Sequence, residues 1–384
     1  MIHRASIVAR LVAALFAAQT FPAGSAPIPL PNSPVVQLPG ASPAQGKVVE
    51  GLKALNAGDL AAAEAAFTEA ARVDPKLSGA YIGLAEVAGR QDKPARVEYW
   101  LKQALTADPN SAMMQRVWGR HQFQRGRFVE AEAAFKKAIA LDPRSSDAQL
   151  NLAENYLFGL KKAKPAEAAY RAAIALDAGS AQAHLGLAAT LGALGQPDAA
   201  LAEYEQAAKL APADAKFTHA LARFQASQGR FDQALVAQQK TIAIAPDFFP
   251  AYIDLGDLYL VKNDLEQAAA AYRAGAKVTK NPATALFKLG TVLEGQQRWA
   301  EAEQAYLDAV KSDPTMYSAY NNLAFMAAVR KERLDDALAW AKKAVELAPK
   351  VTTTQDTLGW VYRARGELGP AAQALVKAVA ANPK

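Results

Sequence analysis

The sequence predicts an all-α protein, a superhelical solenoid built from about ten helix-turn-helix repeats. Three observations predict this fold class. Residues 118–143 carry the apolar spacing of two short amphipathic helices joined by a turn. The same pattern recurs along the chain at an interval close to 34 residues. The composition is 51% hydrophobic and rich in alanine, which suits closely packed helices, and no segment is predicted as a β-strand.

The stretch 118–143 shows the repeat most clearly. Gly126 is expected at the turn between its two helices, because a residue without Cβ adopts a positive φ at little cost. The second helix should end before Pro143, which lacks a backbone N–H and disfavours helical geometry in the residue before it. Apolar residues recur there at the spacing of one helix face: Phe128, Ala131, Phe135, Ala138 and Ile139.

The closing proline of this stretch recurs through the chain. It stands at Pro75, Pro109, Pro143, Pro212, Pro246, Pro314, Pro349 and Pro383. Five intervals between neighbours are 34 or 35 residues, and the other two are double periods with Ala178 and Lys280 at their midpoints. We therefore expect repeats over residues 44–383, with extra residues in repeats four and nine at the turns near 161–162 and 330–333.

Each expected first helix carries a large residue followed by a small one, which lets its partner helix approach closely. These pairs are Leu84-Ala85, Trp118-Gly119, Leu152-Ala153, Leu187-Ala188, Leu221-Ala222, Leu255-Gly256, Leu289-Gly290, Leu323-Ala324 and Leu358-Gly359. The second helices carry alanines such as Ala131 and aromatic residues such as Phe135, so large and small side chains should interdigitate. One repeat cannot bury its apolar face alone, so neighbouring repeats should stabilise one another.

A helix-turn-helix period of 34 residues is the spacing of the tetratricopeptide repeat, and residues 44–383 closely resemble this family. The resemblance implies a partner bound along the concave face of the first helices. At position nine of the last two repeats stand Phe325 and Trp360, where polar residues are common in the family. With Asn321 and Arg363 nearby, they form a candidate platform for a peptide side chain or a sugar ring. The alternative is that both rings pack inside the superhelix.

Position nine of earlier repeats places Glu86, Arg120 and Glu154 on successive first helices with alternating charge. One interpretation is a salt ladder that stabilises the stack only slightly, since exposed pairs contribute about 0–1 kcal/mol each. The other is a polar groove for an extended peptide or a glycan. For this second interpretation, Arg116 and Arg120 are candidate partner-binding residues.

No motif in the chain resembles a catalytic site. The absence of cysteine excludes thiol nucleophiles and Cys-ligated zinc, and the four histidines form no HExxH motif. We therefore expect no enzyme activity, no cofactor and no metal. Glu130 and Glu132 are expected on a solvated face, and His219 is expected to be a polar surface residue rather than a ligand or base.

Residues 1–26 are expected to be a cleaved secretory signal peptide, with Arg4 and Arg10 beside a short apolar run and small residues at its end. An uncleaved anchor or a disordered leader is the alternative. Without a cysteine for lipidation, the mature protein should be periplasmic or secreted and not integral to a membrane. Cleavage reduces the net charge of +6 by two, to +4, which gives little support for a nucleic-acid partner.

Residues 27–43 carry six prolines and are expected to form an extended, semi-rigid linker or, alternatively, a docking peptide for a proline-binding groove. At the other end, the last repeat is expected to leave an apolar flank uncovered, because solenoids usually end in a polar cap. Ala371, Leu375, Val376 and Val379 lie on its second helix, where self-association or partner docking is a hypothesis.

Three segments near the C-terminus, 320–328, 333–349 and 356–367, resemble tetratricopeptide repeat proteins of bacterial envelope and exopolysaccharide export systems. The expected function is a non-catalytic protein–protein interaction scaffold in the cell envelope, with a protein or an extended peptide as partner. A periplasmic glycan-binding module, with polysaccharide as partner, is an alternative. A regulatory subunit of a separate envelope enzyme is another.

Overall fold

The computed structural model describes residues 42–381, and all regular secondary structure in this range is helical. The expected signal peptide 1–26 and nearly all of the linker 27–43 lie outside the described residues. The chain divides into two compact units, which we call the N-terminal unit (residues 42–211) and the C-terminal unit (residues 212–381). Each is described by itself.

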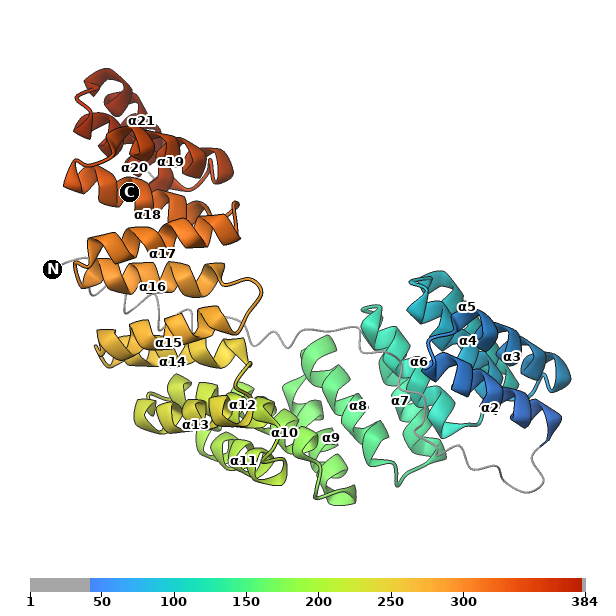
Figure 1. Cartoon of the computed structure of the whole chain (residues 1–384). Coiled ribbons are helices and arrows are strands. Elements are labelled where there is room, and N and C mark those ends of the chain that lie inside the picture. Colours follow the sequence, from blue (N-terminus) through green and yellow to red (C-terminus); the bar gives the residue numbers. More distant parts are fainter. Residues whose placement is uncertain (1–41, 382–384) are drawn as a thin grey trace. The chain divides into compact units, whose positions relative to one another are not determined.

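The helices follow one another in pairs, and each pair is one repeat (Figure 1). The N-terminal unit contains α2 (Pro43–Asn56), α3 (Leu60–Val73), α4 (Ser78–Arg90), α5 (Pro94–Ala107), α6 (Ala112–Gln124), α7 (Phe128–Leu141), α8 (Ser146–Glu154), the π-helix η1 (Asn155–Gly159), α9 (Ala163–Leu176), α10 (Ala181–Ala193) and α11 (Pro197–Leu210). The C-terminal unit contains α12 (Ala215–Ser227), α13 (Phe231–Ile244), α14 (Phe249–Val261), α15 (Leu265–Lys277), α16 (Ala283–Gly295), α17 (Trp299–Ser312), α18 (Tyr317–Arg330), α19 (Leu334–Leu347), α20 (Thr352–Ala364) and α21 (Leu368–Ala381).

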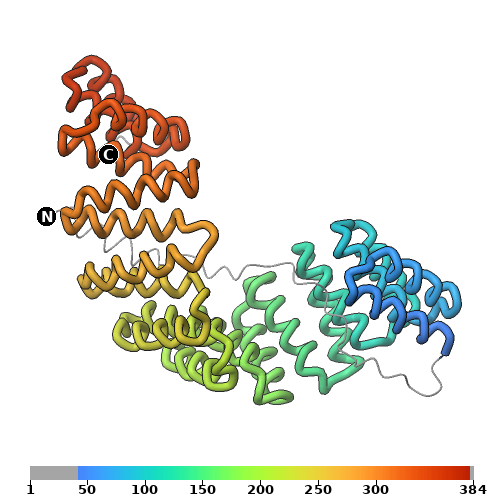
Figure 2. The backbone as a smooth tube through the Cα atoms, viewed as in Figure 1, coloured from blue at the N-terminus to red at the C-terminus, as the bar shows by residue number. Residues whose placement is uncertain are grey.

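The even-numbered helices are the first helices of their repeats, and the odd-numbered helices are the second. Within each unit, a first helix packs against its own second helix, which then packs against the next first helix (Figure 2). Successive first helices also touch, most extensively α18 and α20, whereas successive second helices make fewer contacts. The first helices therefore line the inner side of each stack.

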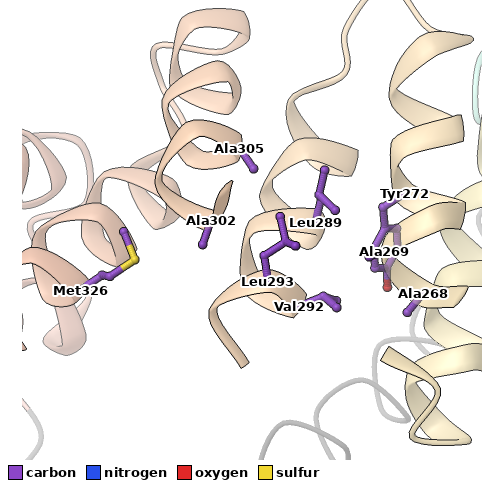
Figure 3. Close-up of a cluster of buried hydrophobic side chains, with 9 residues drawn as sticks. All are labelled: Ala268, Ala269, Tyr272, Leu289, Val292, Leu293, Ala302, Ala305 and Met326. Carbon is purple, nitrogen blue, oxygen red and sulfur yellow. The ribbon is translucent and has the colours of Figure 1, made fainter. Parts of the chain in front are cut away.

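The second helices supply the large side chains of the core. Phe67, Phe135, Tyr170, Tyr272 and Tyr306 are each at most 1% exposed. Figure 3 shows one cluster in the C-terminal unit that continues from α15 to α18, across the boundaries between repeats. It consists of Ala268, Ala269, Tyr272, Leu289, Val292, Leu293, Ala302, Ala305 and Met326. The core therefore crosses the boundaries between these repeats, as expected for repeats that bury their apolar faces against one another.

Small residues hold the space for these rings. A Cβ added to Gly51 would lie 2.6 Å from the Phe67 ring, and a Cβ added to Gly83 would lie 2.5 Å from it. Gly51 belongs to α2 and Gly83 to α4, so the ring of α3 is held between two first helices. The predicted alternation of large and small side chains is confirmed.

Most turns between the two helices of a repeat contain a residue with positive φ. Gly126 has a φ of 73°, which confirms the turn predicted there. Four other glycines share this conformation, namely Gly58, Gly195, Gly229 and Gly366. Asp92, Asn263 and Gln297 adopt it in other turns, so glycine is favoured but not required.

The extra residues of repeats four and nine are accommodated differently. In repeat nine, the turn 331–333 keeps three residues, and α18 is one residue longer than most other first helices. The extra residue therefore lies in the helix and not in the turn that was predicted, and Lys331 and Arg333 after it both have positive φ. In repeat four, the first helix widens into η1, and most of the extra length lies inside the helix, which differs from the prediction. Asn155 is fully buried there, and its Nδ2 donates to the Phe128 carbonyl oxygen at 2.9 Å. This bond to the preceding repeat anchors the wider turn.

Ion pairs join consecutive repeats along the edge where the first helix turns into the second. We call this set the turn-edge ladder. It consists of Arg96–Glu64, Arg127–Glu98, Lys162–Glu132, Lys262–Asp232, Arg298–Glu266, Arg333–Glu303 and Arg365–Asp335. Arg127 and Lys102 lower the pKa of Glu98 to about 2. Glu132 also bonds Lys136 and Tyr156, so the expectation of a fully solvated carboxylate is wrong for this residue.

Candidate functional site

The inner side of α18 and α20 carries the predicted aromatic pair. Phe325 is half-buried and Trp360 is 43% exposed, at matching positions on two first helices that touch. The Arg363 guanidinium lies 5.1 Å from the centroid of the Trp360 ring, close enough for a cation–π interaction. The exposure of Trp360 argues against the alternative in which both rings pack inside the stack.

Asn321 lies one turn before Phe325 on α18 and is half-buried. Its Oδ1 is shielded from water and has no hydrogen-bond partner among the described residues. The neighbouring Asn322 is fully engaged, because its Nδ2 donates to the Tyr306 hydroxyl at 3.0 Å, and that hydroxyl donates to Glu294 at 2.7 Å. Burial raises the pKa of Glu294. Asn322 is therefore held by a side chain of the preceding repeat, whereas the Asn321 Oδ1 is an acceptor without a partner among the described residues.

A second polar group occupies the inner side of α12, α14 and α16, and the sequence analysis did not single it out. Asp257 accepts from the Tyr272 hydroxyl at 2.5 Å and from Lys288 Nζ at 2.7 Å. Asp254, one turn earlier, makes no hydrogen bond within residues 42–381, and its Oδ2 lies 3.7 Å from Arg223 Nε. Burial raises the pKa of Asp254 to about 6. The sequence did contain a signal for this group, because Asp254 and Lys288 stand at position six of successive repeats.

His219 belongs to this group, and the prediction of a polar surface residue is wrong for it. Its side chain is only 13% exposed, and its Nδ1 lies 3.0 Å from Nε2 of the buried Gln238. Its Nε2 lies 3.7 Å from Asp254 Oδ2, and the Phe248 ring packs edge-on against it. Burial lowers the pKa of His219 to about 4. The imidazole is therefore neutral at pH 7.

In the N-terminal unit, Arg116 on α6 pairs with Asp147 on α8 at 3.2 Å. The salt ladder considered for position nine is wrong for Glu86, which pairs with Arg90 of its own helix at 3.0 Å. The charge of Arg120 lowers the pKa of Glu154, but burial has the larger effect, so the pKa of that carboxyl is raised. Most of the inter-repeat ion pairs belong instead to the turn-edge ladder, whereas Arg116–Asp147 joins two first helices.

The exposed flank predicted on α21 is present in part. Val376 and Val379 are 67% and 66% exposed, and Leu368 at the start of the helix is 70% exposed. Ala371 is buried, and Leu375 packs against Gly359 of α20, so these two residues face their own repeat. Self-association through this flank stays a prediction. Sedimentation of the protein and of Val379→Lys tests it, and a wild type that is strictly monomeric would contradict it.

Two further properties bear on the class of protein. Among the described residues, no three His, Asp or Glu side chains come together in a way that could hold a metal ion. Within residues 42–381, no helix has the length and apolar character needed to cross a membrane.

Paired helices, first helices that line one side of each unit, and a core shared between neighbouring repeats define a helical repeat solenoid. The sequence profile of the tetratricopeptide repeat matches residues 48–112, 116–181, 185–247, 253–317 and 287–351. The chain therefore belongs to the tetratricopeptide repeat family.

Known proteins share parts of this chain. Protein O-mannosyl-transferase Tmtc1 of Drosophila melanogaster is 33% identical over 106 residues, which are 26% of this chain and 12% of that protein. The chain thus matches only about an eighth of that relative's length.

Two solved structures share the fold. The C-terminal part of a tetratricopeptide repeat-containing protein from Cytophaga hutchinsonii is 16% identical, with a TM-score of 0.54 over 63% of this chain and 98% of that one. A tetratricopeptide repeat protein from Parabacteroides merdae is 17% identical, with a TM-score of 0.51 over 65% and 98% of the two chains. At these identities the likeness concerns the fold alone.

Proposed function

We propose that this protein is a non-catalytic scaffold that binds an extended segment of a partner protein on the inner side of its C-terminal unit. One observation carries the proposal: Trp360 presents an exposed indole with the Arg363 guanidinium over its ring. Phe325 stands at the matching position of the neighbouring first helix. Proteins of this family typically serve as interaction modules, which agrees with the proposal.

The physical basis is the burial of apolar area beside a charged hydrogen-bond donor. An indole that is nearly half exposed in the free protein gains free energy when a partner side chain covers it. Trp and Arg are enriched among the few interface residues that carry most of the binding free energy, and their truncation often costs about 2 kcal/mol or more. Arg363 adds orientation, since its planar guanidinium can donate to a partner carbonyl or carboxylate while stacked on the ring.

We further propose that the protein is exported and acts in the bacterial envelope, in envelope or exopolysaccharide assembly. The support is the signal-peptide pattern of residues 1–26 and the resemblance of three C-terminal segments to repeat proteins of export systems. A regulatory subunit of a separate envelope enzyme would use the same surface. The mannosyl-transferase activity named for Tmtc1 stays with that protein, of which only 12% is matched.

A glycan-binding module is the second candidate, and the exposed Trp360 favours it because sugar rings stack on indoles. In that case Asn321 and Arg363 would bond the hydroxyl or carboxylate groups of the sugar. The two candidates share the platform and differ in the ligand, so a single experiment separates them.

The test is a pull-down from envelope extract with the wild type beside the Phe325→Ala/Trp360→Ala double variant. A Tyr99→Ala variant serves as control, because Tyr99 is 53% exposed on the second helix α5, whereas the platform residues belong to first helices. One envelope protein retained by wild type and control, but lost by the folded double variant, is the expected result. If the double variant still retained that protein, the result would contradict the proposal. No retained protein, with polysaccharide bound in a parallel assay, would favour the glycan candidate.

A further inference from the structure

Asp254 on α14 is an unusual carboxylate. Its side chain is 19% exposed, and it makes no hydrogen bond among the described residues. Asp257, on the same helix, has two partners in Tyr272 and Lys288. A buried polar group without a partner is costly and uncommon in native proteins, so Asp254 calls for an explanation.

The groups around Asp254 supply positive charge but no hydrogen bond to its Oδ2. Lys288 on α16 is held by Asp257, with distances of 2.7 and 3.1 Å to its two oxygens. His219 on α12 is neutral at pH 7, because burial lowers its pKa to about 4. Arg223, also on α12, has its Nε 3.7 Å from Asp254 Oδ2, which is too long for a hydrogen bond. The site is therefore short of a hydrogen-bond donor.

A second unused acceptor lies further along the same inner side. The Asn321 Oδ1 on α18 is shielded from water and unpartnered among the described residues. Packed helices lie about 8–10 Å apart, so the three steps between the four first helices from α14 to α20 span on the order of 30 Å. An extended chain covers that length with about nine residues at roughly 3.3 Å each. One peptide could thus reach Asp254, Asn321 and Trp360 together.

We propose that the partner segment carries a lysine or arginine whose cationic side chain donates to Asp254, so that this carboxylate selects basic peptides. The inference rests on the proposed function, and it names the class of partner. A cation supplies the missing donor and is also attracted by the ionised carboxylate, and a charge-assisted hydrogen bond is about twice as strong as a neutral one. A backbone N–H would supply only the donor.

The inference has a consequence for pH. Burial raises the pKa of Asp254 to about 6, so the carboxyl is mostly protonated at pH 5 and mostly ionised at pH 7.5. Binding of a basic peptide should therefore strengthen up to about tenfold over this interval, and the gain should disappear in Asp254→Asn.

The test selects ligands from a library of random displayed peptides about twelve residues long, using the purified full chain. We expect enriched peptides to share a lysine or arginine at one position. Replacing it in the synthetic peptide by norleucine or citrulline should weaken binding about tenfold or more, and Asp254→Asn should do the same. Asp247→Asn is the matched control, because Asp247 is an exposed carboxylate in the turn between α13 and α14. Its binding should stay within about twofold of wild type.

Failure of this inference and failure of the proposed function give different results. Two results overturn the inference alone, provided that Phe325→Ala/Trp360→Ala abolishes binding. The enriched peptides lack a basic position, or basic peptides bind Asp254→Asn as well as they bind wild type. If no peptide family is enriched, both are overturned. Circular dichroism of each variant checks folding, and Asp254→Ala provides a second variant with the same expected loss.

Discussion

At the scale of single residues, burial acts in opposite directions on two neighbouring groups. Asp254 and His219 face each other across α12 and α14, and desolvation favours the neutral form of both. It raises the pKa of Asp254 to about 6 and lowers that of His219 to about 4. At pH 7 the free protein therefore holds an ionised carboxylate whose Oδ2 has no hydrogen-bond partner among the described residues, beside an uncharged imidazole and 3.7 Å from Arg223 Nε.

This arrangement predicts that Asp254→Asn stabilises the protein above pH 6. The folded-state pKa is raised, so the folded state binds the proton more tightly, and stability contributed by Asp254 falls as pH rises from about 4 to about 6. Relative to wild type, the variant should gain on the order of 1–3 kcal/mol at pH 7.5 and little at pH 4.5. Urea unfolding at the two pH values measures this. An equal effect at both would contradict the assignment.

His219 changes the stability with pH in the opposite direction. Its folded-state pKa is lowered, so the unfolded state takes up a proton first and stability is lost as pH falls from about 6.5 to about 4. Because this loss offsets the gain from Asp254, the wild type should show only a shallow pH dependence in this range. The comparison between variants is therefore more informative than the wild-type curve.

A second prediction for single residues concerns the glycines of the first helices. A Cβ on Gly256 would lie 2.3 Å from the buried Tyr272 ring, so Gly256→Ala should destabilise the protein by about 1–3 kcal/mol. In Gly79→Ala the new Cβ meets nothing within 4 Å, and the better helix former should be neutral or stabilising by up to about 1 kcal/mol. Thermal unfolding of both variants checks the difference in sign.

The sequence predicted some of these residues and not others. The large–small pairs were predictable because each consists of two consecutive residues and recurs along the chain. Leu255-Gly256 is an example, since a Cβ on Gly256 would meet the Tyr272 ring. The difference between Asp254 and Asp257 was not predictable. It depends on which side chains of three successive first helices meet. The spacing of two acids on one helix does not show which of them will find a partner.

At the scale of helices and repeats, close approach leaves no room for larger side chains. Ala131 on α7 is fully buried, and Ala131→Phe should overpack its repeat and cost about 1–3 kcal/mol or more. Helicity and melting temperature report the effect. If both are unchanged, the assignment of α7 to the core face is wrong.

The π-helix η1 gives a prediction for repeat four. Asn155 is fully buried, and Asn155→Ala leaves the Phe128 carbonyl without this partner, at a cost of about 1–3 kcal/mol. Asn110→Ala, in the exposed turn before α6, should change stability by less than about 0.5 kcal/mol. A comparable loss in both variants would show that the bond to Phe128 does not anchor η1.

Repeat four also shows what spacing can and cannot determine. The period of 34 residues revealed that a residue had been added, because the closing positions shift by one. It could not reveal whether a loop lengthens or a helix widens, since both preserve the positions of the neighbouring repeats. The buried amide of Asn155, which bonds the previous repeat, favours the wider helix.

At the scale of the whole molecule, the fold follows from a pattern repeated often enough to be unambiguous. Ten occurrences of a weak signal predict a solenoid more securely than one strong motif would. The same redundancy hides function, because inner positions differ from repeat to repeat. Phe325 and Trp360 stood out only because they depart from the polar residues expected there.

The turn-edge ladder is the clearest electrostatic feature shared by both units, and each of its pairs has at least one exposed side chain. Exposed ion pairs contribute about 0–1 kcal/mol each and weaken with salt, so the ladder should add modest stability that depends on ionic strength. Arg298→Gln/Arg365→Gln removes two of its pairs in the C-terminal unit. At about 50 mM salt this variant should lose roughly 1 kcal/mol, and at about 500 mM less than half of that.

The matched control is Lys277→Gln/Lys311→Gln, which makes the same change in net charge. Both lysines are exposed and form no ion pair among the described residues. If the ladder acts through its specific pairs, the control keeps wild-type stability at both salt concentrations. Equal losses in the two double variants would show that net charge, rather than the pairing of consecutive repeats, sets the salt dependence. Because each repeat is stabilised mainly by its neighbours, a small change at every interface adds up along the stack.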